Sequence, residues 1–193
     1  MPTNWWATMA ETLGELLERA SVRSDVGLRF VDRAERAHFF PWSEVWSRAL
    51  DACGRLQRAG VKEGHRVALI FPTSFQFITA FFGAVLARAV PVPMYPPVRL
   101  HLLDQYTVRT ARMLDAVSAR LVLADARVRP VLGAAVSAAA PPLGCRTLRE
   151  LDGGVAAPAR GAADDLALIQ FSSGTTVEPK PVALSQRAVV THT

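Results

Sequence analysis

The sequence predicts an α/β fold in which helices cover both faces of a parallel sheet. The main observation is that two continuous apolar segments, Val67–Phe71 and Leu121–Ala124, alternate with amphipathic helical segments at Ser74–Ala87 and Leu103–Val117. Strands without alternating polar positions are buried on both faces, which is typical of parallel sheets packed between helices. The second observation is composition. Half of the 193 residues are hydrophobic and 20% are charged, so the chain can bury a substantial core.

The segment before this alternation predicts a helix, a hairpin and a second helix. Thr12 and Glu15 have the spacing of a capping box, and leucines at helical spacing follow them. Val26–Val31 and His38–Pro41 predict the two strands of a hairpin, because a charged turn separates them. Ser43 is the expected cap of the second helix, whose apolar residues recur at three- and four-residue spacing until a glycine ends it.

The remaining elements continue the alternation of strands and helices. Pro91–Tyr95 predicts a short strand and Val128–Ala138 a helix, and a connection rich in proline and glycine follows. Leu166–Phe171 is the last clear apolar strand, and we expect it to continue the parallel pattern. Ser185 is the expected cap of a final helix. Ligands of parallel sheets bind at the carboxyl ends of the strands, so the loop after Leu166–Phe171 is the first candidate site.

Charge and cysteine content exclude several classes of function. The formal net charge is +5, but the 20 arginines and two lysines are scattered, and Asp115 and Asp125 interrupt the densest arginine stretch. A nucleic-acid-binding face requires clustered basic residues, so we expect no nucleic-acid partner. Cys53 and Cys145 lie 92 positions apart and have no closely spaced partners. We therefore expect reduced thiols and a cytoplasmic protein.

One uncharged stretch is long enough to raise the question of a membrane span. The 21 residues between Arg66 and Arg88 carry no charge, which is the length of a transmembrane helix. Pro72, Thr73 and Ser74 divide this stretch, however, into a five-residue strand and a helix. We expect no membrane span.

The loop after Leu166–Phe171 has the residue types that bind a polyphosphate. Consecutive backbone N–H groups in a tight turn bind anions, glycine allows close approach of the backbone, and hydroxyl and lysine side chains add donors and charge. The candidate binding residues are Ser172, Ser173, Gly174, Thr175, Thr176 and Lys180. By composition alone, an exposed turn rich in serine and threonine explains these residues equally well. The chain has neither a Walker loop nor a Gly-x-Ser-x-Gly elbow.

Three motifs resemble those of the adenylate-forming (AMP-binding) superfamily. The segment from Ser172 to Lys180 is similar to its phosphate loop, whose pattern is [ST]-[ST]-G-[ST]-T-G-x-P-K-G, and the segment GHRVAL at 64–69 resembles its GDRVAL strand. The sequence FFGA at 81–84, followed by VPVPMYPP at 90–97, resembles the fatty acyl-AMP ligase branch. The resemblance covers nearly the whole chain. It implies the N-terminal part of the large domain of such an enzyme.

The resemblance implies activation of a fatty or other carboxylic acid. ATP and Mg²⁺ would give an acyl-adenylate and pyrophosphate, and the acyl group would pass to an acyl carrier protein or a downstream synthase module. The family's catalytic lysine, magnesium-binding glutamate and fatty-acid tunnel are expected downstream of this chain. We therefore assign no catalytic residue and no metal ligand here, and we expect the chain alone to be inactive.

On this basis the chain divides into four parts of one incomplete adenylation subdomain. These are a helix-and-hairpin unit at 1–62, a βα core at 63–140, a connection at 141–163, and a strand with the phosphate loop at 164–193. Tyr95-Pro96-Pro97 predicts a rigid strand exit, and a role in shaping an acyl pocket is the alternative. Arg109 is expected on solvated helix surface, with contact to an acidic carrier protein as the alternative.

Three positions depart from the family pattern. Val177 and Pro181 stand where the family usually has glycine, and Gln186 stands where it often has histidine. A β-branched residue is strained where a glycine adopts positive φ, and proline lacks a backbone donor. These departures favour an alternative function, in which the chain is a degenerate, non-catalytic relative that serves as a binding or interaction module.

Overall fold

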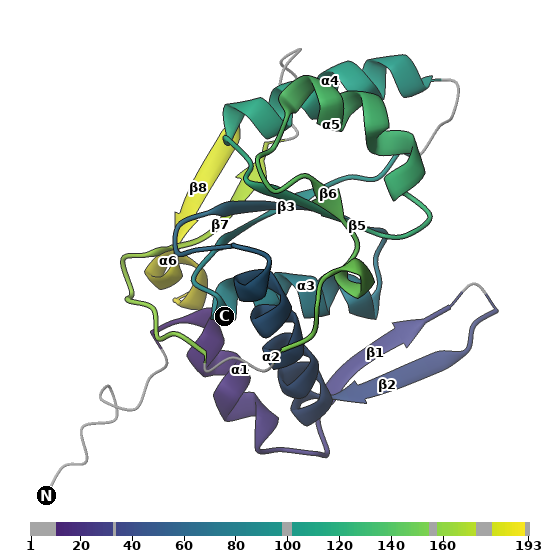
Figure 1. The fold of residues 1–193 in the computed structure, drawn as a ribbon. Helices are drawn as coiled ribbons and strands as arrows, with labels where there is room; N and C mark the ends of the chain where they lie inside the picture. The colour runs from purple at the N-terminus through teal and green to yellow at the C-terminus, as the bar shows by residue number, and fades with distance from the viewer. Residues whose placement is uncertain (1–10, 33, 98–101, 155–157, 173–178, 192–193) are drawn as a thin grey trace, which may run out of the picture.

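A computed structural model describes residues 11–32, 34–97, 102–154, 158–172 and 179–191 of the chain. Its helices are α1 (Leu13–Ser21), α2 (Trp42–Arg58), α3 (Phe75–Leu86), α4 (Leu103–Ala116), α5 (Gly133–Ala139) and α6 (Gln186–Val190). Its strands are β1 (Gly27–Val31), β2 (Ala37–Pro41), β3 (Arg66–Ile70), β4 (Val90–Met94), β5 (Leu121–Ala124), β6 (Cys145–Arg146), β7 (Leu166–Phe171) and β8 (Pro181–Ser185). These elements confirm the predicted α/β fold (Figure 1).

A four-stranded parallel sheet forms the centre of the fold, in the order β4-β3-β5-β6. Strand β3 pairs in parallel with β4 on one side and with β5 on the other. Every residue of β5 is buried, as are Val67 to Ile70 of β3, which confirms that the continuous apolar runs are central strands. The two-residue strand β6 pairs with β5 and lies within the proline- and glycine-rich connection, where its sequence has no apolar run.

Alternate residues of β3 enter two different cores on opposite faces of the sheet. Ala68 and Ile70 belong to the core under α4 and α5, whereas Val67 and Leu69 belong to the core that includes residues of α2 and α3. Figure 1 shows α4 and α5 on one side of the sheet and α2 and α3 on the other. The helices therefore cover both faces, as the sequence predicts.

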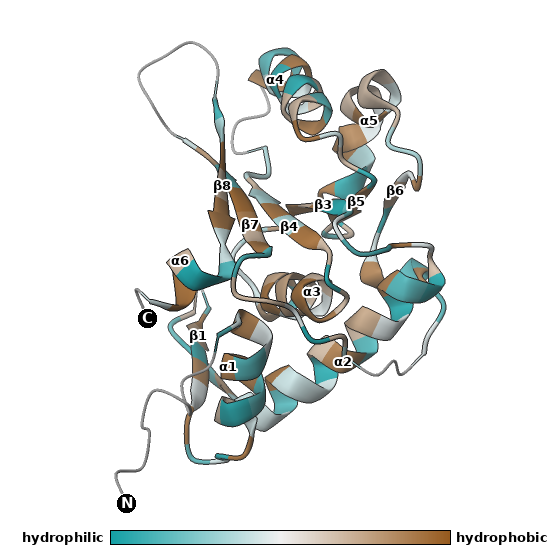
Figure 2. Ribbon diagram, turned by 90° about the vertical axis from the view of Figure 1, so that its left-hand side faces the viewer, coloured by the Kyte–Doolittle hydropathy of each residue, from teal (hydrophilic) through white to brown (hydrophobic). Residues whose placement is uncertain are grey.

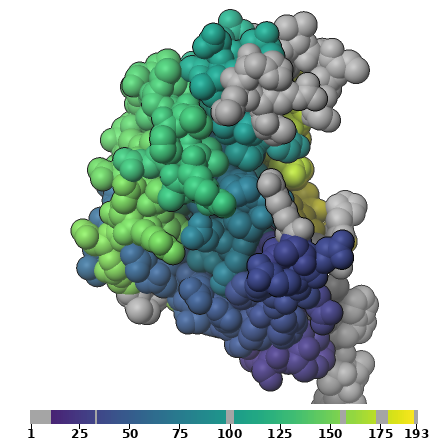
Figure 3. Space-filling view, turned by 90° about the vertical axis from the view of Figure 1, so that its right-hand side faces the viewer, coloured from purple at the N-terminus to yellow at the C-terminus, as the bar shows by residue number. Residues whose placement is uncertain are grey.

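The N-terminal hairpin lies beside α2 and α3 rather than in the central sheet. Strands β1 and β2 pair antiparallel, as predicted, and the ring of Phe40 stacks on Phe75 of α3 with centroids 3.9 Å apart. In the space-filling view, the purple and blue N-terminal elements form the lower part of the molecule, below the green surface of α5 and the connection (Figure 3).

Two predicted helix starts differ in detail from the structure. Helix α2 begins at Trp42 with Pro41 at its N-cap and no side-chain cap, so the prediction that Ser43 caps it is wrong. Pro41 has extended backbone angles and a side chain without an acceptor, so this helix begins without a side-chain cap. At α1 the Thr12 hydroxyl accepts from the Glu15 amide at 3.2 Å, while the Glu15 carboxylate accepts from the Glu11 amide at 2.8 Å. Thr12 therefore caps α1 as predicted, whereas Glu15 accepts from the Glu11 amide and not from the Thr12 amide, as a full capping box requires.

Strand β7 has the predicted limits but not the predicted partner. It pairs antiparallel with β8, and this hairpin lies next to β4 (Figure 2). β7 therefore does not extend the hydrogen-bonded parallel ladder as expected, although its carboxyl end lies beside that of β4. A buried apolar run does not indicate the direction of its neighbour, and β8 begins with Pro181 immediately after the loop.

The predicted helix at Val128–Ala138 is divided into two. A 3₁₀ turn, Arg129–Leu132, precedes α5, because Pro130 sits in its first turn and lacks an amide for continuous α-helical bonding. Ser185 caps α6 as predicted, accepting from the Ala188 amide at 3.2 Å. Among the described residues, no helix is both long and apolar enough to cross a bilayer.

Candidate functional site at the end of the C-terminal hairpin

Ser172 and Lys180 are the two predicted loop residues with polar side chains that the structure describes. They lie opposite each other at the end of the hairpin where the loop joins β7 to β8. The Ser172 amide donates to the Lys180 carbonyl at 3.0 Å, which extends the β7–β8 ladder by one bond. Both residues are exposed. No carboxylate among the described residues pairs with Lys180. The predicted binding residues Ser173, Gly174, Thr175 and Thr176 lie outside the described residues, as does Val177.

Pro181 occupies a strand position that does not require its missing amide. It is the first residue of β8 and stands opposite Phe171, the last residue of β7. Proline is tolerated at the first position of a strand for this reason. The departure from glycine at this position is therefore accommodated by the hairpin itself.

The other end of the hairpin is fixed by a network of charged and amide groups. The Arg88 guanidinium contacts Glu63 at 2.7 Å and Asp165 at 2.9 Å, and Asp165 directly precedes β7. Gln186 follows β8, is buried, and accepts from the Leu13 amide at the start of α1 at 2.9 Å. These bonds hold the hairpin against the N-terminal helix and the sheet. The side chain at the position of the family histidine therefore has a structural contact in this chain.

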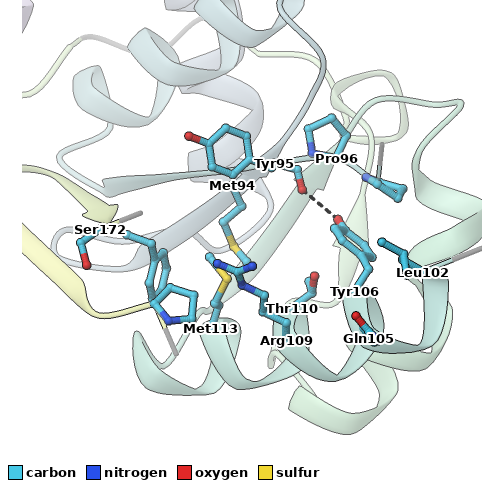
Figure 4. A pocket seen from close by; sticks show the side chains of 13 residues that line it. Met94, Tyr95, Pro96, Leu102, Gln105, Tyr106, Arg109, Thr110, Met113 and Ser172 are labelled. Atoms are coloured by element: carbon cyan, nitrogen blue, oxygen red, sulfur yellow. Dashed lines mark hydrogen bonds between the residues drawn. The ribbon is translucent and has the colours of Figure 1, made fainter. Parts of the chain in front are cut away.

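A cavity of about 480 Å³ lies between the hairpin and α4. Its lining comes from the exit of β4, from α4 and from the hairpin, and comprises Met94, Tyr95, Pro96, Pro97, Leu102, Gln105, Tyr106, Arg109, Thr110, Met113, Phe171, Ser172 and Pro179. Figure 4 shows Ser172 at one end of this cavity and Leu102 and Gln105 at the other. The cavity therefore begins where the predicted phosphate loop begins, at the carboxyl ends of β4 and β7.

The wall formed by α4 is tied to the exit of β4 by one hydrogen bond. The Tyr106 hydroxyl donates to the Tyr95 carbonyl at 3.0 Å (Figure 4). Burial raises the pKa of Tyr106 above its usual value, so this hydroxyl remains a donor at neutral pH. Because Pro96 and Pro97 restrict the backbone that follows Tyr95, the bond fixes a segment that is already stiff. The predicted rigid strand exit thus becomes one rim of the cavity.

Tyr95, Pro96 and Pro97, for which a pocket-shaping role is the alternative interpretation of the sequence, line this cavity, whereas the wall formed by α4 was not predicted. Tyr106 and Met113 lie at helical spacing within the predicted helix Leu103–Val117, and in the sequence this spacing indicates only the buried face of a helix. Met113 and Thr110 are indeed buried, and the same face lines the cavity beyond the edge of the sheet. Only the position of α4 relative to β7 distinguishes the two roles. Among the described residues, no group of three or more histidine, cysteine or acidic side chains could hold a metal ion.

The parallel sheet between helices, with the hairpin of the predicted phosphate loop beside it, agrees with the class of enzyme that the sequence motifs resemble. The comparisons with known proteins lead to the same class. The AMP-binding enzyme family matches residues 23–193, so this chain belongs to that family.

The similar proteins include enzymes named as CoA ligases and as an AMP ligase. The chain is 34% identical over 142 residues to 4-hydroxybenzoate–CoA/benzoate–CoA ligase of Rhodopseudomonas palustris, an alignment of 66% of this chain and 25% of the relative. It is 29% identical over 168 residues to the long-chain-fatty-acid–AMP ligase FadD26 of Mycobacterium marinum, covering 81% of this chain and 27% of the relative. The chain thus spans about a quarter to a third of these relatives.

Solved structures show the same fold. A structure from studies of fatty acyl-adenylate ligases from E. coli and L. pneumophila has a TM-score of 0.86 and 28% identity, covering 94% of this chain and 33% of that one. McyG A-PCP complexed with phenylalanyl-adenylate has a TM-score of 0.83 at 22% identity, covering 93% of this chain and 33% of that chain. The latter similarity concerns the fold alone.

Proposed function

We propose that this chain supplies the triphosphate-binding part of a ligase that converts a fatty acid and ATP to acyl-AMP and pyrophosphate. The observation that carries the proposal is the position of the phosphate loop, which leaves β7 beside an apolar cavity at the carboxyl ends of the strands. A phosphate-binding group and an apolar cavity are the two parts that activation of a fatty acid requires. In the complete enzyme, the acyl group would then pass to a carrier protein or synthase module.

The proposed role of the loop is to hold the β- and γ-phosphates during the reaction. An oxygen of the substrate carboxylate attacks the α-phosphorus, the bond from that phosphorus to the bridging oxygen breaks, and pyrophosphate leaves. Ser172, Ser173, Gly174, Thr175 and Thr176 would donate hydrogen bonds to the departing phosphates, and Lys180 would balance their charge. Holding reactants in line and stabilising developing charge are the main means of catalysis in phosphoryl-group chemistry. Mg²⁺ bound to the triphosphate would neutralise further charge, and we assign it no ligand from this chain.

The two lysines of the chain allow a direct test. An ATP analogue with an amine-reactive acyl phosphate should modify Lys180, and excess ATP with Mg²⁺ should prevent this modification. Lys62 is the matched control, because it lies in the turn before β3, far along the chain from the loop. Peptide mass spectrometry measures both sites in one sample. Equal labelling of the two lysines, unaffected by ATP, would refute the proposal.

The affinity for ATP should change in the same way. We expect Lys180→Met to weaken binding of ATP with Mg²⁺ by roughly tenfold or more, because a charge-assisted hydrogen bond to phosphate contributes about 1.5–3 kcal/mol. Lys62→Met should leave the affinity unchanged. Isothermal titration of the two variants measures the difference.

The second candidate function is a non-catalytic binding or interaction module. One observation favours it: Gln186, at the position of the family histidine, is buried and accepts from the Leu13 amide at the start of α1. This function predicts a stably folded chain that neither reacts with the ATP analogue nor binds ATP. The labelling experiment therefore separates the two candidates.

A further inference from the structure

We propose that His65 is an acid-sensitive switch: protonation of its ring opens the turn between α2 and β3 and, through Arg88, loosens the C-terminal hairpin. This inference goes beyond the proposed function and does not depend on it. It concerns a position at which this chain departs from the family pattern, because His65 stands where the GDRVAL motif has aspartate.

The ring of His65 closes the turn as a hydrogen-bond acceptor. The His65 amide donates to the Lys62 carbonyl at 3.1 Å, and the Lys62 amide donates back to Nδ1 of the His65 ring at 3.1 Å. Gly64 allows this turn, because its φ of +71° lies in the left-handed region. A neutral ring with its proton on Nε2 accepts the bond, whereas a protonated ring has a proton on both nitrogens and accepts none. Proton uptake by His65 therefore breaks this bond.

Three cationic side chains lie near the ring and oppose its protonation. Lys62 belongs to the same turn, Arg66 begins β3, and Arg120 precedes β5, with its amide bonded to the Arg66 carbonyl at 2.9 Å. No carboxylate in the described segments forms an ion pair with these three side chains. In the same segments, Nε of Arg120 is buried without a hydrogen-bond partner. A positive charge on His65 would therefore join a group of cations that no carboxylate balances.

The sign of the pH effect follows from this environment. Burial, together with the charges of Arg120, Lys62 and Arg66, lowers the pKa of His65 below its ordinary value of 6.5. The contribution of His65 to stability is therefore fully present above pH 6.5 and is lost as the pH falls through the lower folded value. Aspartate and glutamate titrate near about pH 4, so they change little between pH 7.5 and pH 5.5.

The turn is connected to the hairpin through Arg88. The Gly64 amide donates to the Arg88 carbonyl at 2.8 Å, and Glu63, the acidic residue of the turn, contacts the Arg88 guanidinium at 2.7 Å. The same guanidinium contacts Asp165, directly before β7, at 2.9 Å. Opening of the turn would release two contacts that position Arg88. The hairpin would then be held less firmly at the end opposite the phosphate loop.

Thermal melting at pH 7.5 and pH 5.5 tests the switch. We expect the melting temperature of the unaltered chain to fall over this range, and His65→Asp to reduce the fall by roughly 2–4 °C, the effect of about one hydrogen bond in a chain of this size. The aspartate of the family motif accepts from the Lys62 amide at both pH values and balances the nearby cations. His65→Asn retains an acceptor at the position of Nδ1 without a charge, and should also reduce the fall.

His38→Asn is the matched control, because it removes a histidine outside the turn. His38 is exposed on β2, and its ring contacts the Asp32 carboxylate at 3.3 Å, an arrangement that favours a protonated ring. This substitution should therefore not reduce the fall in melting temperature. A fall of the same size in the unaltered chain, His65→Asp and His65→Asn would overturn the switch.

Hydrogen exchange measured by mass spectrometry tests the connection to the hairpin. At pH 5.5, peptides that contain β7 and β8 should exchange faster in the unaltered chain than in His65→Asp, and the difference should be smaller at pH 7.5. Comparison of the two chains at one pH removes the intrinsic pH dependence of exchange. Equal exchange of these peptides in both chains at pH 5.5 would refute the connection through Arg88. Neither measurement involves ATP, so failure of the switch leaves the proposed function standing, and failure of Lys180 labelling leaves the switch standing.

Discussion

At the scale of single residues, Arg88 shows why a strained backbone is retained. It joins α3 to β4 with φ of +55°, in the left-handed region that normally suits glycine. This conformation costs a non-glycine residue about 1–2 kcal/mol. Glycine would avoid the strain but would lack the guanidinium that contacts Glu63 and Asp165. The side chain at this turn therefore connects the central sheet to the hairpin that carries the phosphate loop.

The Asp165 carboxylate should make stability depend on acid pH. The Ala162 amide, which donates to it at 2.7 Å, and the Arg88 guanidinium hold its pKa below the ordinary value of 3.8. A carboxylate with a depressed pKa in the folded state stabilises fully above 3.8, and this stability is lost as pH falls through the lower folded value. We expect Asp165→Asn to lower the melting temperature at pH 7 and to reduce its fall on acidification.

The adjacent Asp164 provides the control for this measurement. Its carboxylate is 84% exposed and pairs with Arg187 on the surface, so Asp164→Asn should change the melting temperature little. Melting curves from pH 7 to pH 3 compare the two variants with the unaltered chain. An Asp165→Asn curve that parallels the unaltered one at every pH would show that this carboxylate does not contribute to the acid sensitivity.

At the scale of elements, the crossing of α2 and α3 depends on a glycine. A Cβ added to Gly83 would lie 2.6 Å from the Ala52 Cβ and 3.2 Å from the backbone of α2. Replacing glycine with alanine usually stabilises a helix by about 1 kcal/mol, but overpacking costs about 1–3 kcal/mol. We therefore expect Gly83→Ala to destabilise the chain, as measured by denaturant unfolding. The double variant with Ala52→Gly should recover part of the loss. A Gly83→Ala variant more stable than the unaltered chain would contradict this packing.

The strands also show which features of an element can be predicted from its sequence pattern. Leu121–Ala124 and Leu166–Phe171 are strands with the limits predicted, because burial on both faces leaves a continuous apolar run. The partner of β7 was not predictable from that run, since antiparallel pairing with Pro181–Ser185 depends on a loop that returns the chain. Strand β6 was missed because two residues carry no periodicity.

The same contrast applies to the candidate site. Hydroxyl residues, glycine and lysine in one short segment identify a possible phosphate loop, because that chemistry is local in sequence. The cavity beside it combines β4, α4 and β7, which are separated by many residues and meet only in the folded chain. Arg109 was accordingly expected on solvated helix surface, and only the folded chain places it in the wall of this cavity.

At the scale of the whole molecule, the two cysteines lie on opposite sides of the central sheet, so the reaction rate of each thiol measures how readily its own side opens. Cys53 of α2 is fully buried in a core with α1 and α3, and Cys145 of β6 is partly buried against the core under α4 and α5. Burial raises the pKa of the Cys53 thiol to about 11 and also raises that of Cys145. Because the thiolate is the reactive form, both cysteines should react slowly with a thiol reagent at pH 8 in the native state.

We expect the two reaction rates to respond differently to denaturant. Cys53 should react only when α1, α2 and α3 separate from one another, so its rate should follow global unfolding measured by circular dichroism. Cys145 should react faster in native buffer, since the two-residue strand β6 can open without the rest. Mass spectrometry of the modified peptides resolves the two sites, and Cys145→Ser and Cys53→Ala provide single-thiol controls. Rapid modification of Cys53 while the circular dichroism remains native would mean that the packing of α1, α2 and α3 opens independently of the sheet, so that the chain does not unfold as one unit.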